Sequence, residues 1–171
     1  SVNVLFEFFC STKFKLMLFG AGHVGQALVP ILEGLPIELH WVDNRMTKLR
    51  PKVGGSVALI DSDDPVGEIK HMKPNCSYLI MTHNHQLDFD LLRAVIDRED
   101  ADYIGLIGSE TKWRRFKMRL DHYGYKSAAY DSVRCPVGLP SVKGKHPMEV
   151  AVSVAAQLIT HYGEHEKNKQ Q

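Results

Sequence analysis

Short apolar runs alternate along the chain with segments in which apolar positions recur every three to four residues. The apolar runs predict strands at residues 16–19, 37–42, 56–60, 77–81 and 103–107. The helical spacing predicts helices after Gly20, from Pro65 to about residue 71, and over 87–96, 110–122 and 147–161. This alternation predicts an α/β fold, a Rossmann-like doubly wound parallel sheet in three αβα layers. We expect that domain at residues 15–162, between a leader or linker at 1–14 and a polar tail at 163–171.

A glycine-rich turn joins the first predicted strand to the first predicted helix. The stretch from Gly20 to Gly25, which includes His23 and Val24, has the spacing G-x-G-x-x-G. Gly20 lets the backbone turn, Gly22 leaves room for a pyrophosphate, and Gly25 lets the helix lie close to the strand. The helix N-terminus offers free N–H groups and a positive dipole end. The turn therefore predicts a dinucleotide or nucleotide site, the alternative being a turn that only packs.

The second predicted strand ends in an acidic residue. Asp43 follows Gly22 by about 20 residues, the place from which an acid holds a ribose 2′-hydroxyl. Arg45 complicates the choice of cofactor, because an arginine there holds a 2′-phosphate that Asp43 would repel. We expect NAD or NADP at this site, with NAD favoured.

A polar stretch follows the fourth predicted strand. Thr82, His83, Asn84 and His85 come directly after the strand, and Asp88 comes one helical turn later. Ligands of such sheets lie at the carboxyl ends of the strands, so we predict Thr82 as a cofactor contact and His83, His85 and Asp88 as catalytic candidates. The alternative is that Thr82, Asn84 or His85 caps the next helix. The sequence shows no third ligand at a fixed spacing, and we predict no metal site.

The fifth predicted strand is followed by a cap signal and a basic helix. Ser109 is predicted to cap that helix and to contact the cofactor, and Lys112 and Arg115 lie where they could reach an anionic ligand. The alternative for these basic residues is a solvated helix face. Residues 132–138 are predicted as a loop or a short sixth strand, with Cys135 interpreted as a small buried residue rather than a reactive thiol.

Composition narrows the classes of function. The chain has 171 residues, 44% of them hydrophobic and 24% charged, and its net charge is +1, so we expect neither a nucleic-acid nor a membrane partner. Residues 4–10 are apolar but too short to span a bilayer. Cys10, Cys76 and Cys135 show neither metal nor disulfide spacing, which indicates a reducing, cytoplasmic compartment.

Five separated motifs resemble, in order, the XdhC/CoxI family of xanthine dehydrogenase accessory proteins. They are residues 19–25, residues 42–45, residues 81–85 with Asp88, residues 104–109 with Lys112 and Arg115, and residues 136–139 leading into 147–156. The resemblance covers roughly residues 16–159 and implies a Rossmann-type C-terminal domain. It also implies a role in maturing molybdenum hydroxylases, by binding the molybdenum cofactor and delivering it in sulfurated form to the apoenzyme. Pro147-Met148-Glu149 departs from the more acidic turn of the family.

Three hypotheses of function follow. The first is an accessory or maturation protein for a molybdenum hydroxylase, with a nucleotide or the molybdenum cofactor on the glycine turn and His83, His85 and Ser109 on the opposite wall. The second is an NAD(P)-dependent oxidoreductase in which His83 or His85 gives a proton to a carbonyl, although we do not expect a classical dehydrogenase. The third is a regulatory module that senses a nucleotide. The expected partners are the hydroxylase apoenzyme and a second copy of the chain.

Overall fold

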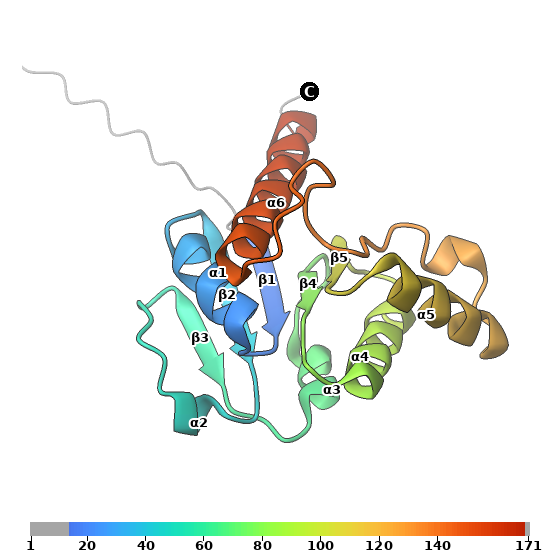
Figure 1. The fold of residues 1–171 in the computed structure, drawn as a ribbon, viewed down its shortest axis with the longest axis horizontal. Helices are drawn as coiled ribbons and strands as arrows, with labels where there is room; N and C mark the ends of the chain where they lie inside the picture. The colour runs from blue at the N-terminus through green and yellow to red at the C-terminus, as the bar shows by residue number, and fades with distance from the viewer. Residues whose placement is uncertain (1–13, 170–171) are drawn as a thin grey trace, which may run out of the picture.

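The structure of the chain, a computed structural model, describes residues 14–169, with side chains described up to residue 164 (Figure 1). The leader predicted at residues 1–14 thus lies outside the described residues except for Phe14. The elements in chain order are β1 (Phe14–Phe19), α1 (His23–Glu33), β2 (Ile37–Val42), α2 (Met46–Leu49), β3 (Val57–Ile60), α3 (Pro65–Glu68), η1 (Ile69–His71), β4 (Ser77–Ile80), α4 (His85–Asp97), β5 (Tyr103–Leu106), α5 (Glu110–His122), η2 (Ser127–Ala129) and α6 (Pro147–Lys169).

The five strands form one parallel sheet in the order β3-β2-β1-β4-β5. The first strand, β1, lies in the middle of the sheet. The chain adds β2 and β3 on one side of β1 and then crosses to add β4 and β5 on the other side. The direction in which strands are added therefore reverses between β1 and β4. These two strands pair directly, with Phe19 opposite Ile80. The predicted doubly wound sheet is confirmed, and its ligand-binding edge is expected where β1 and β4 end.

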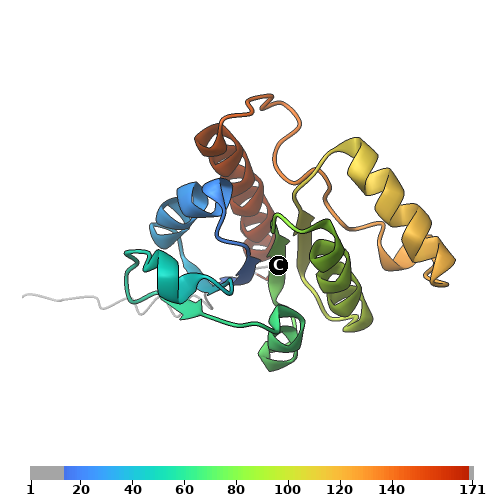
Figure 2. The same ribbon diagram turned by 60° about the horizontal axis from the view of Figure 1, so that its bottom comes forward.

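Helices cover both faces of the sheet, as Figures 1 and 2 show. Side chains of β1 alternate between two cores, as the strand period requires. Leu16 and Leu18 belong to the core that includes α1 and α6, and Met17 and Phe19 belong to the core that includes α4 and α5. The predicted three-layer αβα arrangement is confirmed.

Two connections differ from the prediction or sharpen it. Residues 44–51, for which no element is predicted above, contain the short helix α2, and its Met46 is buried in the core to which α1 contributes. In the segment predicted as a loop or a sixth strand, Arg134 makes an isolated parallel bridge to Gly105 of β5. Its N–H donates to Ile104 and its carbonyl accepts from Leu106, both at 2.9 Å. The segment therefore extends the sheet edge without forming a full strand.

Helix α6 is longer than predicted. It begins at Pro147, as expected, and Glu149 lies in its first turn, but it continues to Lys169 through much of the predicted tail. Its buried face, which includes Ala151, Val154 and Leu158, packs into the core formed with α1. Within the described residues, no helix combines the length and the apolar character that crossing a bilayer requires.

Candidate functional site

The first glycine of the turn brings the ends of β1 and β4 together. Gly20 has φ +108°, in the left-handed region that favours glycine. A Cβ atom on Gly20 would lie 2.4 Å from the carbonyl oxygen of Met81, at the end of β4. A Cβ atom on Gly25 would lie 2.6 Å from the carbonyl oxygen of Gly20, so α1 packs directly on the turn. The positive φ of Gly20 agrees with its predicted role in turning the backbone, and the close contact at Gly25 agrees with its predicted role in packing the helix.

The second glycine faces open space. Gly22 is the exposed N-cap residue of α1, and no side chain of the described residues caps the helix there. A Cβ atom on Gly22 would meet no atom of the described residues within 4 Å. His23, the first residue of the helix, is also exposed. The first N–H groups of α1 thus lie beside open space, where an anion could accept them.

Asp43 is held against the turn. Its Oδ2 accepts the N–H of Ala21 at 2.7 Å and Arg45 Nη2 at 2.8 Å, and its Oδ1 accepts the N–H of Arg45 at 2.9 Å and Nε at 2.8 Å. Burial opposes ionisation of Asp43, but these hydrogen bonds together outweigh it and hold the pKa of Asp43 below its usual value. Asp43 and Arg45 thus form a charged pair beside the glycine turn.

A buried tryptophan side chain is hydrogen-bonded to the glycine turn. The indole Nε1 of Trp41 donates to the carbonyl oxygen of Gly20 at 2.9 Å, and the residue is 1% exposed. Gln26 Nε2 donates to the carbonyl of Ala21 at 2.9 Å from the side of α1. These contacts fix the shape of the turn, and they make Trp41 a built-in fluorescent reporter of it.

The loop after β4 lies against the glycine turn. The side chain of Asn84 caps α4, accepting the N–H groups of Gln86 and Leu87 at 2.9 Å and 3.0 Å, so one of the alternatives from the sequence is confirmed. His83 and His85 are exposed at this edge of the sheet. Their predicted catalytic role stays a prediction, because the geometry shows position and access but no substrate contact.

Asp88 and Lys112 form a buried ion pair between the first turns of α4 and α5. Lys112 Nζ lies 2.6 Å from Asp88 Oδ2, and the two side chains are 9% and 0% exposed. Asp88 Oδ1 accepts the N–H and the hydroxyl of Thr82 at 3.1 Å and 2.6 Å, and Lys112 Nζ also donates to the carbonyl of Ile107 at 2.8 Å. Ser109 caps α5, as predicted, by accepting the N–H of Lys112 at 3.2 Å. This geometry gives Asp88 and Lys112 a positioning role, and ligand contacts of Asp88, Lys112, Ser109 and Thr82 stay predictions.

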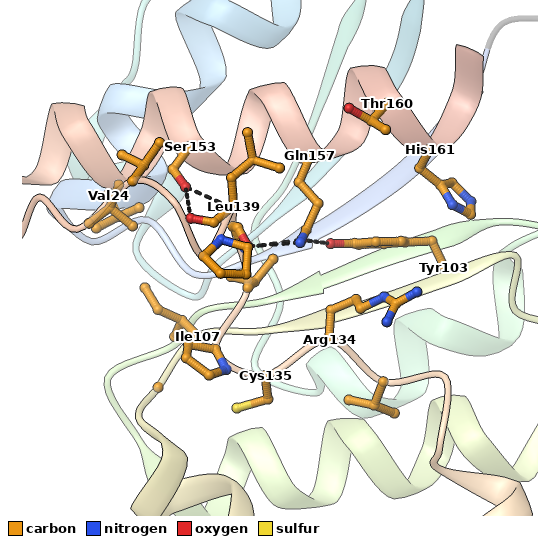
Figure 3. Close-up of a pocket in the computed structure, with 18 of the residues that line it drawn as sticks. Val24, Tyr103, Ile107, Arg134, Cys135, Leu139, Ser153, Gln157, Thr160 and His161 are labelled. Atoms are coloured by element: carbon orange, nitrogen blue, oxygen red, sulfur yellow. Dashed lines mark hydrogen bonds between the residues drawn. The ribbon is translucent and has the colours of Figure 1, made fainter. Parts of the chain in front are cut away.

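A cavity of about 1020 Å³ lies between α6 and the segment 133–145 (Figure 3). Val24 and Gly108 line it near the carboxyl edge of the sheet. Tyr103 of β5 and His161 of α6 line its other end. Of the site residues predicted from the sequence, only Val24 contributes to this wall. Sequence reasoning missed the cavity, although Pro136, Gly138 and Pro140 signalled an irregular loop over the sheet edge.

Side chains of α6 hold the cavity wall in place, as Figure 3 shows. Gln157 accepts the N–H of Gly138 at 3.0 Å and the hydroxyl of Tyr103 at 2.5 Å, and its Nε2 donates to the carbonyl of Gly138 at 2.8 Å. Ser153 Oγ accepts the N–H of Leu139 at 2.8 Å. Gly138 has φ +109°, and a Cβ atom there would lie 2.6 Å from Ser153 Oγ, so glycine is required at this contact.

Cys135 lines the same cavity. The side chain is half-buried, and burial raises the pKa of its thiol to about 11. The thiol is therefore protonated at neutral pH, which agrees with its interpretation as a packing residue. Among the described side chains, up to residue 164, no group of three or more His, Cys, Asp or Glu residues is placed to hold a metal ion.

The chain is similar to a known protein family and to proteins of known sequence and structure. The family model described as the XdhC Rossmann domain matches residues 16–158. The uncharacterized protein YqeB of Escherichia coli (strain K12) is 27% identical over 148 residues, which cover 85% of this chain and 27% of YqeB. A crystal structure described as a xanthine dehydrogenase (BH1974) from Bacillus halodurans matches with a TM-score of 0.76 at 28% identity, covering 92% of this chain and 46% of that one.

These matches cover most of this chain but only part of the proteins it resembles. The chain spans less than a third of YqeB and less than half of the Bacillus halodurans protein. The matched family segment runs from within β1 to within α6 and so contains the turn, the Asp43–Arg45 pair and the Asp88–Lys112 pair. The chain belongs to the XdhC Rossmann-domain family.

Proposed function

We propose that this chain is the Rossmann domain of an accessory protein that matures a molybdenum hydroxylase of the xanthine dehydrogenase type. In this proposal, the turn at residues 20–25 holds the phosphate of a nucleotide or of the molybdenum cofactor, and the apoenzyme is the partner that receives the cofactor. The observation that carries the proposal is the open space in front of Gly22, at a helix end that no described side chain caps. Membership of the XdhC family supports the link to molybdenum enzymes.

The turn fits a phosphate group by its chemistry. A phosphate needs several N–H donors that converge on one point, and the first turn of α1 offers backbone N–H groups that have no acceptor within the helix. The helix dipole adds positive potential at the same point. Because Trp41 and Gln26 hold the carbonyl groups of Gly20 and Ala21, the turn is organised before a ligand arrives.

The cavity beside the turn suits the bulky part of such a cofactor. Val24 lies two residues after Gly22 and lines the cavity, so the two regions meet at the start of α1. The cavity also has apolar walls at Ile107 and Val137 and polar groups at Ser153 and Gln157. Mixed walls of this kind suit a planar heterocycle with polar edges. The molybdenum cofactor, when bound, supplies the metal centre that the partner enzyme uses.

A second candidate is an NAD(P)-dependent oxidoreductase. It is favoured by the position of Asp43, whose hydrogen bond to Ala21 places a carboxylate beside the glycine turn, where a dinucleotide ribose lies. The exposed His83 and His85 at the same edge would then be the proton donors. Turnover of NADH or NADPH with a carbonyl substrate would favour this candidate over cofactor delivery.

The variant Gly22→Val tests the phosphate site. Gly22 has φ −74° and ψ −172°, an extended conformation that valine adopts, so the added side chain fills the gap without straining the backbone. We expect purified variant protein to bind molybdopterin, NAD and NADP at least about tenfold more weakly than wild type, as measured by the intrinsic fluorescence of Trp41 and Trp113. Gly55→Val is the matched control, because a Cβ atom there also meets no described atom within 4 Å. Unchanged affinity in Gly22→Val, with both variants folded, would contradict the proposal.

A further inference from the structure

The Asp43 carboxylate is saturated with hydrogen bonds. A carboxylate offers about four acceptor positions, two on each oxygen. In this structure Oδ1 accepts the N–H and Nε of Arg45, and Oδ2 accepts the N–H of Ala21 and Nη2 of Arg45. Two of these four bonds come from the backbone and two from the Arg45 side chain. A ligand hydroxyl therefore finds no position on Asp43 unless the guanidinium leaves.

A ribose with free 2′- and 3′-hydroxyls meets this obstacle directly. Its hydroxyls would donate to Asp43, and each would have to replace one bond from Arg45, at 2.8 Å. A charge-assisted, two-pronged bond from arginine is stronger than the neutral hydroxyl bonds that would replace it. The Asp43–Arg45 pair thus disfavours a ribose diol.

A phosphate on the ribose meets a different surface. The guanidinium has five N–H donors, of which Nε and Nη2 each give one to Asp43, and no other acceptor for them is found among the described residues. The Arg45 side chain is 37% exposed and that of Asp43 only 7%, so the cation faces outward and the carboxylate inward. Arg45 can therefore bind a phosphate while it keeps its bonds to Asp43.

Other charges near the pair offset one another. Asp61 follows β3 and accepts the N–H of Thr47 at 2.7 Å and the Thr47 hydroxyl, and these hydrogen bonds lower the pKa of Asp61. Lys48 lies close enough to favour the charged form of Asp61. Asp43 acts on Asp61 in the opposite direction and disfavours its charged form. Asp61 is thus the acidic group that a phosphate at Arg45 has to avoid, and the outermost group of the Asp43–Arg45 pair is the guanidinium.

We propose that Arg45 is a specificity-determining residue, which makes this cleft prefer nucleotides that carry a phosphate on the ribose 2′ position over nucleotides with a free diol. The inference rests on the proposed function, because it assumes that the ligand's pyrophosphate lies on the turn at residues 20–25. It reverses the preference for NAD that Asp43 alone indicates.

Titration of wild type and Arg45 variants with NADP and with NAD tests the proposal. We expect wild type to bind NADP about tenfold or more tightly than NAD, because a charge-assisted phosphate contact replaces a disfavoured diol. In Arg45→Ala the order inverts, since NADP loses its contact and NAD gains two positions on Asp43. Arg45→Lys keeps the positive charge but not the paired N–H donors of the guanidinium, and we expect a smaller preference for NADP. Unfolding curves of each variant show that the fold is kept.

Three outcomes overturn the proposal. They are equal binding of the two nucleotides to wild type, a ratio that Arg45→Ala does not change, and no binding of either nucleotide. The proposed function is judged separately, by whether molybdopterin binds and whether Gly22→Val abolishes that binding. If molybdopterin binding depends on Gly22 but no nucleotide binds, the phosphate site stands and the assignment of Arg45 fails.

Discussion

Two acid–base pairs lie at the same edge of the sheet and are built alike. Asp43 accepts a backbone N–H from Ala21 in the loop after β1, and Asp88 accepts one from Thr82 in the loop after β4. Each carboxylate also pairs with a cation, at 2.8 Å to Arg45 in one case and 2.6 Å to Lys112 in the other. Each carboxylate thus binds both its cation and a backbone N–H of a loop that follows a strand.

Burial separates the two pairs. Lys112 is 9% exposed and Asp88 is 0% exposed, whereas Arg45 is 37% exposed. Asp43 is also mostly buried, at 7% exposed, but water can reach it through the space that the half-exposed Arg45 side chain would leave, whereas both members of the Asp88–Lys112 pair are buried and a charge left alone there is costly. The comparison teaches that the pair between α4 and α5 is the better shielded from water and that the pair beside the glycine turn is the more accessible to a ligand.

The largest expected effect comes from breaking the buried pair. Lys112→Met leaves the Asp88 carboxylate without its cation, and we expect the free energy of unfolding to fall by roughly 3–5 kcal/mol. The matched change in the half-exposed pair, Arg45→Ala, should cost less, about 1–2 kcal/mol, because Asp43 keeps the backbone N–H groups of Ala21 and residue 45 and gains access to water. Urea unfolding monitored by circular dichroism measures both. The distinction between the pairs fails if the two variants lose the same stability.

A smaller effect concerns acid stability. The folded protein holds the pKa of Asp43 below the unfolded value of about 3.9. The stability that this gives is fully present above the unfolded pKa and is lost as the pH falls through the folded pKa. We expect Asp43→Asn to be less stable than wild type at neutral pH, and to lose less further stability between about pH 5 and pH 2. Unfolding curves at a series of pH values measure this, and identical pH dependence would count against the paired, ionised Asp43.

Local signals were enough to predict most of the fold. The predicted strand at residues 37–42 is β2 itself, and the predicted helix at 110–122 is α5, because an apolar run defines the one and the Ser109 cap defines the start of the other. The glycine turn could be predicted in the same way, since the spacing of its glycines and its position after a strand are both set by neighbouring residues. Such features depend on neighbours in the chain.

Features that depend on distant neighbours could not be predicted. The ion pair of Asp88 and Lys112 was not predicted, because the two residues are 24 positions apart and only the packing of α4 and α5 brings them together. Their predicted ligand contacts stay a prediction. All four acceptor positions of Asp43 are occupied only because the Arg45 side chain donates two N–H groups to it, and sequence spacing does not show these bonds. The cavity arises where Gln157 of α6 holds the backbone of Gly138, and a pattern of apolar positions carries no sign of that bond.

The central claim is that the turn after β1 is the anion-binding site. It is tested most directly by following backbone amide signals. Isotope-labelled protein would be titrated with inorganic pyrophosphate in a two-dimensional NMR experiment. The account predicts that the amides of Gly22, His23 and Val24 shift most, while those of residues 109–112 stay nearly unchanged. Shifts centred on residues 109–112, with the glycine turn unaffected, would contradict it.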